Sequence, residues 1–398
     1  MVDYALSDLT VIDLTHRIAG PFCTQLLAGL GAEVIKIEKP GEGDAARRMG
    51  PFPEGDPDPD KSALFLYLNT GKKGITLNLK HPTGVKIVKQ LVEKADILVE
   101  SFSPRVMPGL GLSYETLQEI NPRLIMTSIS NFGQTGPYRD YKSEDIVAAA
   151  MGGMLYITGD PDREPLRQGG FQAQYQGGLN GFVGTLTALF YRDMTGEGQQ
   201  VDISLMEVMA SILEHTIVSY SYSGEIMKRS GNQGGLHPWG LYPCKDGYVA
   251  VVANPTQWPR IAKLMENLQL EDPKYETMAA RQEHGQEIDQ LMLPWLKERT
   301  MEQIYHTAQA WRLPFGYVAT PADLINSPQL KAREFFQTID HSKTGPILYP
   351  GAPFKMTETN GWQMTPSPLL GQHNEEIYCG KLGYSKEDLL NMKEAGVI

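Results

Sequence analysis

Residues 9–38, which read LTVIDLTHRIAGPFCTQLLAGLGAEVIKIE, decide the fold class of this 398-residue chain. The segment 9–15 is mostly apolar and β-branched, a pattern typical of a strand, and 32–38 repeat that pattern. Between them, 20–31 predict a helix that a proline opens and a glycine closes. A strand, a helix and a strand in this order predict a parallel sheet covered by helices.

The same alternation continues beyond this unit. Residues 83–96 show helical apolar spacing, 97–102 resemble a strand, 113–122 a helix and 124–130 a further strand. Ser113 is the expected N-cap of the third of these segments. The fold class is therefore α/β, with a Rossmann-like, doubly wound parallel sheet in a large domain.

The domain organisation follows from a change of pattern near residue 225. We expect 1–224 to form the first part of the large domain, with 201–222 as one long amphipathic helix. Residues 225–325 predict a smaller α+β domain, because 239–254 contain a Lys-Asp-Gly turn between two short apolar runs. Residues 326–398 then return to the large domain.

Composition excludes several classes of partner and of location. A net charge of −11 argues against binding nucleic acid or an anionic membrane. Three separate cysteines without a CxxC pair indicate neither a disulfide framework nor a metal site. The longest uncharged run, 168–191, contains four glutamines, so it predicts a buried helix and no membrane span. With no signal-peptide pattern at the start, we expect a cytoplasmic protein.

The carboxyl ends of parallel strands bind ligands in such folds, so we place a ligand crevice around 15–21, 38–44 and 101–107. His16 and Arg17 directly follow the first strand. No GxGxxG fingerprint follows that strand, which disfavours a dinucleotide.

Residues 72–105 are rich in cations, because they contain seven lysine or arginine residues and only three acidic residues. Lys86, Lys89 and Lys94 are explained by a solvated helix face. Four cations at loops or strand ends are better candidates for holding phosphates: Lys72, Lys73, Lys80 and Arg105.

Five segments together resemble the family III CoA-transferases, which include formyl-CoA and carnitine CoA-transferases and α-methylacyl-CoA racemase. These segments are 13–44, 71–84, 91–102, 186–209 and 368–385. The resemblance implies a large domain built from both termini, a small domain, and two chains interlocked as a dimer. It also implies CoA thioester and carboxylic acid substrates and no tightly bound cofactor.

The resemblance further implies a CoA site, which shares Lys80 with the cation pattern, and the cation pattern adds Arg105 to it. Its residues are His16, Arg17, Ala19, Lys39, Leu77, Lys80, Phe102 and Lys142. Phosphates need such cations, and the pantetheine arm needs an apolar slot. One departure is Gly109, which stands where the family usually has arginine.

The nucleophile of the family is an aspartate that attacks the acyl-CoA thioester. Pro165, Leu166 and Gly169 match the family segment that precedes it, and they place Gln174 at the aspartate position. An amide oxygen is a poor nucleophile, so Gln174 is expected to be chemically silent. Glu144 stands at the position of the racemase histidine, which argues against racemisation.

Three functions remain open. The first is a non-catalytic subunit that pairs with a homologous catalytic subunit, as in benzylsuccinate CoA-transferase, which is built from two unlike chains. The second is a self-sufficient acyl-CoA transferase or lyase that uses another carboxylate, Asp145 or Glu144. The third is a binding or regulatory relative without a reaction.

Overall fold

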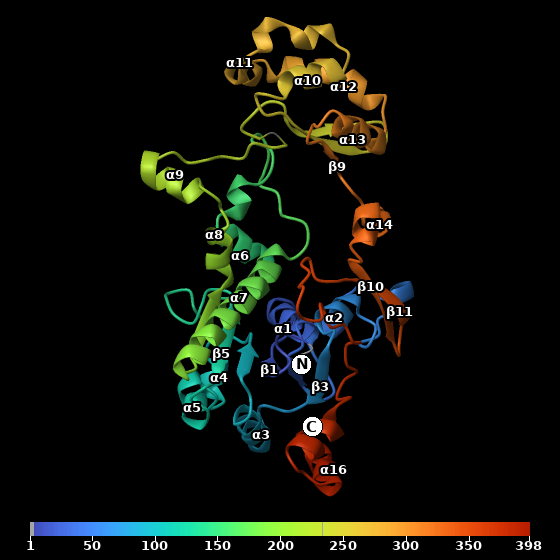
Figure 1. Cartoon of the computed structure of the whole chain (residues 1–398). Coiled ribbons are helices and arrows are strands. Elements are labelled where there is room, and N and C mark those ends of the chain that lie inside the picture. Colours follow the sequence, from blue (N-terminus) through green and yellow to red (C-terminus); the bar gives the residue numbers. More distant parts are fainter. Residues whose placement is uncertain (1–3, 233) are drawn as a thin grey trace. The chain divides into compact units, whose positions relative to one another are not determined.

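The computed structural model describes residues 4–232 and 234–398, which form two compact units (Figure 1). The first unit contains the chain up to Met154 together with Gln168–Val218 and Ala332–Ile398. The second contains Leu155–Arg167 and Ser219–Lys331. The division into domains at residues 225 and 325 stays a prediction.

A six-stranded parallel sheet forms the centre of the first unit and confirms the α/β fold class. In spatial order its strands are β3 (Lys72–Thr76), β2 (Glu33–Glu38), β1 (Thr10–Leu14), β4 (Ile97–Glu100), β5 (Ile125–Ser130) and β6 (Gln200–Ser204). The chain runs outward from β1 to one edge and from β4 to the other. The point between β1 and β4 is therefore the topological switch point, where such sheets bind ligands.

The prediction of one long helix at 201–222 is wrong. Gln200–Ser204 instead form strand β6, which pairs in parallel with β5 from Met126 to Ser130. The Ser204 side chain then accepts a hydrogen bond from the backbone of Glu207 and begins a separate helix, α8 (Leu205–Ser211). Pairing with a distant strand overrides the local helical pattern here.

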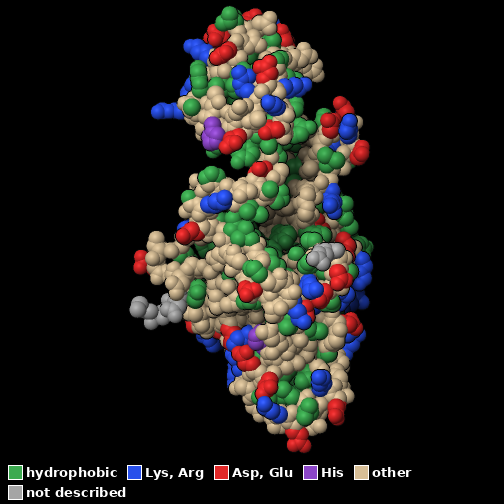
Figure 2. Space-filling model, turned by 90° about the vertical axis from the view of Figure 1, so that its right-hand side faces the viewer, with side chains coloured by type: hydrophobic (Ala, Val, Ile, Leu, Met, Phe, Trp, Pro, Cys, Tyr) green, Lys and Arg blue, Asp and Glu red, His purple; other side chains and the backbone are tan. Residues whose placement is uncertain are grey.

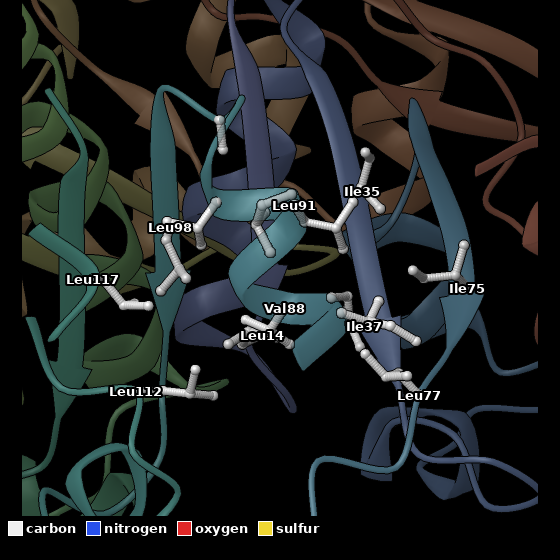
Figure 3. Packing of buried hydrophobic residues seen from close by; sticks show 14 of the residues in the cluster. Leu14, Ile35, Ile37, Ile75, Leu77, Val88, Leu91, Leu98, Leu112 and Leu117 are labelled. Carbon is white, nitrogen blue, oxygen red and sulfur yellow. The ribbon is translucent and has the colours of Figure 1, made fainter. Parts of the chain in front are cut away.

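Helix α3 (Pro82–Val92) packs its apolar stripe on one face of the sheet (Figure 3). Val88 and Leu91 of this helix lie over Leu14, Ile35 and Leu98 from three neighbouring strands, and all five are at least 95% buried. Alternate strand residues face the other side. This large apolar cluster fixes the sheet on which the site is built.

Helices α1 (Ala19–Gly29) and α7 (Gln172–Thr195) pack closely together, and α7 also packs against β5 and β6. A Cβ atom added at Gly178 would lie 2.4 Å from the Ala19 carbonyl oxygen, so only glycine permits this approach. The contact holds the second turn of α7 against the first turn of α1. Gln174 is thereby brought to the carboxyl end of β1.

The second unit contains a three-stranded sheet in the order β7 (Trp239–Pro243), β8 (Tyr248–Val252) and β9 (Gly316–Tyr317). Strands β7 and β8 are antiparallel, and the Cys244 N–H donates to the Gly247 carbonyl, which confirms the predicted hairpin. Its main helices are α10 (Trp258–Leu264), α11 (Met278–Glu283), α12 (Gly285–Lys297), α13 (Met301–Ala310) and α14 (Pro321–Asn326).

Shorter elements complete the chain. They are α2 (Ala63–Leu68), α4 (Val106–Gly109), α5 (Tyr114–Ile120), α6 (Asp145–Met151), α9 (Thr216–Ser223), α15 (Pro328–Ala332), the hairpin strands β10 (Phe336–His341) and β11 (Gly345–Pro350), and α16 (Lys386–Glu394). The C-terminal segment lies beside β3, where the His373 N–H donates to the Gly74 carbonyl.

Lysine and arginine side chains are interspersed with aspartate and glutamate on the face that Figure 2 displays. In the part of the chain that the structure describes, no helix is both long enough and apolar enough to span a bilayer.

Candidate functional site

Two cavities open at the carboxyl ends of β1 and β4, where the strand order reverses. The polar cavity has a volume of about 210 Å³ and the apolar cavity a volume of about 380 Å³. His16, which follows β1, and Phe102, which follows β4, line both cavities, and their rings stack 5.8 Å apart. The two cavities therefore share one wall.

The polar cavity brings together residues from loops and helix ends that are far apart in the sequence, between His16 and Leu205. Its lining includes the predicted site residues Arg17, Ala19, Lys142, Glu144 and Gln174. Serine hydroxyls and an asparagine amide fill much of the remaining wall. Hydrogen-bonding groups of this density suit a small charged or polar ligand.

The apolar cavity contains the predicted residues Lys39, Leu77 and Lys80. Leu77 is buried, while both lysines are exposed. Val106 and Leu110 add to the apolar wall. An apolar wall with cations beside it matches a ligand that carries both an apolar part and phosphates.

Arg105 lies in neither cavity, and its side chain is 74% exposed. It forms a two-point ion pair with Asp140, at 2.6 and 2.9 Å. Lys72 was also a candidate for phosphate binding, but it is buried beneath the site. Its ammonium donates to Asp13 at 3.0 Å and to Asn69 at 2.9 Å, so this prediction is wrong. Burial lowers the pKa of Lys72 to about 8 in spite of the Asp13 carboxylate.

The backbone of Arg17 has a φ of +67°, in the left-handed region that arginine rarely adopts. The Arg17 N–H donates to a carboxylate oxygen of Asp44 at 2.8 Å, and that buried carboxylate pairs with Lys36 at 2.8 Å. Burial alone would raise the pKa of Asp44, but Lys36 together with hydrogen bonds from the Ala46 and Arg17 N–H groups holds the pKa below its usual value. A buried ion pair thus fixes the strained residue whose side chain enters the polar cavity.

His16 is largely buried at the shared wall. Burial lowers the pKa of its imidazole, and the nearby Asp44 carboxylate offsets that effect only in part. The backbone N–H of His16 donates to the Ser101 hydroxyl at 3.1 Å. His16 is thus a neutral ring at neutral pH and supplies a stacking surface rather than a charge.

Gln174 lies in the first turn of the 24-residue helix α7. Its backbone N–H donates to the Asp145 carboxylate at 3.1 Å. Asp145 itself begins α6, so the carboxylate of one helix caps the first turn of the other. A helix start of this kind favours negative charge, yet the side chain at position 174 is a neutral amide.

Glu100 ends β4 directly below the site and is buried. Burial raises its pKa from 4.5 to about 7, although hydrogen bonds from Ser128 and from the Phe102 N–H favour the charged form. The Glu100 carboxyl is therefore held in a place that disfavours its charge.

Replacing Glu100 by glutamine is expected to reduce the loss of stability between pH 5 and pH 8. Because the folded-state pKa is raised, the group contributes most to stability below pH 4.5 and loses that contribution as the pH rises to about 7. Between pH 5 and pH 8, the free energy of unfolding of the wild-type protein should fall by on the order of 1–3 kcal/mol more than that of Glu100→Gln. Urea denaturation at both pH values measures it. An equal pH dependence in both proteins would contradict this account.

Comparison with known proteins places the chain in a family. Residues 6–374 match the model of CoA-transferase family III. The chain belongs to that family. CoA thioesters are the substrates of these transferases, which use no tightly bound cofactor.

Relatives of this family III chain match it from end to end. It is 36% identical over 397 residues to the succinyl-CoA–D-citramalate CoA-transferase of Chloroflexus aurantiacus. That alignment covers 99% of this chain and 98% of the relative. It is 35% identical over 402 residues to the succinyl-CoA:(R)-benzylsuccinate CoA-transferase subunit BbsE of Thauera aromatica, and the alignment covers 97% of each chain. A CAIB/BAIF family protein from Brucella suis has a similar crystal structure, with a TM-score of 0.86 and 32% identity, over 95% of this chain and 99% of that one.

Sequence reasoning missed Ser130, Asn131 and Arg139, which line the polar cavity of this family III chain. All three lie in or after β5, whose carboxyl end borders the same edge of the sheet as β4. Extending the search for ligand-binding loops to this strand would have found them. Within residues 4–232 and 234–398, no group of three or more His, Cys, Asp or Glu side chains is placed to hold a metal ion.

Proposed function

We propose that this chain is the non-catalytic subunit of a heteromeric CoA-transferase that moves CoA between an acyl-CoA and a carboxylic acid. The partner would be a homologous chain that retains the nucleophilic aspartate. The observation that carries the proposal is the amide of Gln174 in the polar cavity, at the position where the resemblance to the family places that aspartate.

The chemistry explains why this amide matters. In the family reaction a carboxylate attacks the thioester carbonyl and gives a mixed anhydride with release of the CoA thiolate. The thiolate then attacks the anhydride, frees the first acid and leaves an aspartyl-CoA thioester. The acceptor carboxylate attacks this thioester and gives a second mixed anhydride with release of the CoA thiolate, which attacks the acceptor carbonyl, forms the new acyl-CoA and frees the aspartate. A neutral amide oxygen is too weak a nucleophile to begin this sequence.

The alternative is a self-sufficient transferase or lyase that uses Glu144 or Asp145. Its support is that Glu144 lines the same cavity. Both carboxylates, however, already accept hydrogen bonds from protein groups. Glu144 binds the Arg17 guanidinium at 2.7 and 2.8 Å, and Asp145 accepts the Gln174 N–H. These hydrogen bonds stabilise the two charged carboxylates, and each carboxylate would have to give its bonds up in order to act as a nucleophile or a base. We therefore favour the first proposal.

A partner chain is supported by the exposed face of α7. Val183, Phe190 and Met194 on this helix are 53%, 67% and 65% exposed. Apolar side chains gathered on one helix are typical of a surface that another chain covers. The name of the Thauera aromatica relative also identifies it as a subunit. We propose that the two chains interlock, as the family resemblance implies, in a cytoplasmic enzyme.

CoA would lie in the apolar cavity and reach the polar cavity past the shared wall. We assign its phosphates to Lys39 and Lys80 and its apolar arm to Leu77 and Phe102. Gly109 lies in the short helix α4 with Val106, which lines this cavity. The family usually has an arginine at the position of Gly109, so this chain has one positive charge fewer near the cavity.

Expression of the chain alone and together with its homologous partner tests the proposed function. We expect no CoA transfer by the single chain and transfer by the co-expressed pair. Co-expression is needed because interlocked chains must unfold before they can exchange partners. Robust CoA transfer by the purified single chain would overturn the proposal.

A further inference from the structure

Three cations gather beside the apolar cavity, around one exposed carboxylate. Lys39, Arg48 and Lys80 all line this cavity. The Lys39 ammonium donates to the Glu42 carboxylate, and this hydrogen bond, together with the charges of the three cations, holds the pKa of Glu42 below its usual value. The edge of the cavity therefore carries more positive charge than Glu42 can neutralise.

The carboxylates that line the cavity itself are already paired in the interior. Glu38 accepts two hydrogen bonds from the Arg47 guanidinium, at 2.7 and 2.8 Å, and Asp44 pairs with Lys36 at 2.8 Å. These four side chains are buried. Asp60, which is not part of the lining, also pairs with Arg47, at 2.8 Å. Even with Asp60 counted, the cations around this cavity outnumber the carboxylates.

Arg48 is held at the cavity without losing its charge. One nitrogen of its guanidinium donates to the backbone carbonyl of Glu42 at 2.6 Å. Within residues 4–232 and 234–398, Arg48 forms no ion pair with a carboxylate. A guanidinium presents several N–H groups in one plane, which is the geometry that binds two oxygens of a phosphate. Arg48 is therefore placed and charged for a phosphate.

A short 3₁₀ helix, η1 (Ala45–Arg48), explains this placement. Three residues complete one turn of such a helix, so neighbouring side chains point in different directions. Arg47 is buried against Glu38, whereas Arg48 is exposed and lines the cavity. The Asp44 side chain begins η1 by accepting the Ala46 N–H at 2.8 Å. Arg48 thus stands on a support that buried ion pairs fix.

Helix α4 borders the same cavity without contributing a cation. Val106 and Leu110 line the cavity, and Gly109 between them has no side chain. The family usually has an arginine at the position of Gly109. The positive charge that this position lacks is thus available at the same cavity from the loop after β2, at Arg48.

We propose that Arg48 is a third phosphate-binding residue of the CoA site and that it supplies the positive charge that Gly109 does not. Lys39 and Lys80 bind the phosphates with it, and Glu42 compensates part of the positive charge while no CoA is bound. The inference rests on the proposed CoA site in the apolar cavity and is independent of which chain carries the nucleophile. Binding of this kind forms and breaks no covalent bond.

Titration calorimetry of the full chain with CoA tests the role of Arg48. Arg48→Gln should weaken CoA binding about three- to tenfold, because it removes a charge-assisted contact that solvent partly screens. Pantetheine, which has the thiol arm of CoA without its phosphates, is the control ligand, and its affinity should not change. Arg123→Gln is the matched control variant and should leave CoA affinity unchanged. Arg123 is also exposed and donates to a backbone carbonyl, that of Gly196 at 3.3 Å, but it lines neither cavity.

Two further variants test the compensation of charge. Gly109→Arg, introduced into the Arg48→Gln variant, should restore most of the lost affinity, because it returns a cation to the same cavity. Nothing lies within 4 Å of a Cβ atom at Gly109, so the new side chain can begin without a clash. Glu42→Gln should tighten CoA binding about two- to fivefold, since it removes a carboxylate that competes with the phosphates. The Glu42 variant keeps the test decisive if Arg48→Gln folds poorly.

The proposal is overturned by unchanged CoA affinity in Arg48→Gln, by an equal loss in Arg123→Gln or with pantetheine, or by a failure of Gly109→Arg to restore binding. Weaker binding by Glu42→Gln, or no CoA binding by the wild-type chain, would overturn it as well. The proposed function fails by a different measurement, which is CoA transfer by the single chain. If that chain transfers CoA and the calorimetric pattern still holds, the role of Arg48 stands and only the silent role of the chain is wrong.

Discussion

Gln174→Ala is expected to leave CoA transfer by the assembled complex nearly unchanged, whereas removal of the partner's aspartate should abolish transfer. The amide forms no covalent intermediate, so its loss removes no step of the reaction. Loss of a covalent nucleophile, by contrast, commonly costs several orders of magnitude in rate. Steady-state assays of the two variant complexes against the wild-type complex measure the difference.

Hydroxylamine provides a second measurement of the same prediction, because it traps aspartyl thioesters. Mass spectrometry after treatment with acyl-CoA should find the modification on the partner and none on this chain. A large loss of activity in the Gln174→Ala complex, with normal folding and assembly, would contradict the silent role. Glu144 and Asp145 would then be the next residues to replace.

Lys39→Ala combined with Lys80→Ala is expected to weaken CoA binding by roughly 1–3 kcal/mol for each charge-assisted contact that is removed. Both lysines are exposed beside the apolar cavity, so solvent screens their attraction for phosphates and the difference should shrink in high salt. Calorimetry with CoA at low and high ionic strength gives both quantities.

Lys86→Ala combined with Lys94→Ala is the matched control for that experiment. These exposed lysines flank the same part of the sequence but line neither the polar nor the apolar cavity. Equal loss of affinity in both double variants would mean that CoA responds to overall charge rather than to a site. Absence of CoA binding by the wild-type chain would place the working CoA site on the partner alone.

The sequence was sufficient for the strands whose residues are mostly apolar or β-branched, such as 9–15 and 124–130. It was insufficient for β3, because Lys72 and Lys73 make that strand resemble a loop. The ammonium of Lys72 is tolerated inside the sheet because Asp13 on another strand compensates its charge at 3.0 Å and because Asn69 and the Pro21 carbonyl accept its other hydrogen bonds. Because Asp13 lies 59 residues away in the sequence, the local pattern around Lys72 does not reveal it.

The candidate site shows the same limit. Position relative to a strand end pointed to His16, to Lys80 and to the segment that contains Lys39, and all three line the two cavities, since the fold carries such positions to one edge of the sheet. Arg105 also follows a strand, but its side chain turns to Asp140 and leaves both cavities. The pairing of Arg17 with Glu144 joins residues 127 positions apart, so only the folded chain brings them together.

Gly109 has a consequence for how this subunit can change over generations. Nothing lies within 4 Å of a Cβ atom placed there, and the residue ends α4 at the surface, so a side chain can begin at this position without a clash. A glycine codon becomes an arginine codon by a single nucleotide change. A glutamine codon needs more than one change to encode aspartate. Mutation can therefore restore the missing cation beside the apolar cavity more readily than it can restore the aspartate at position 174.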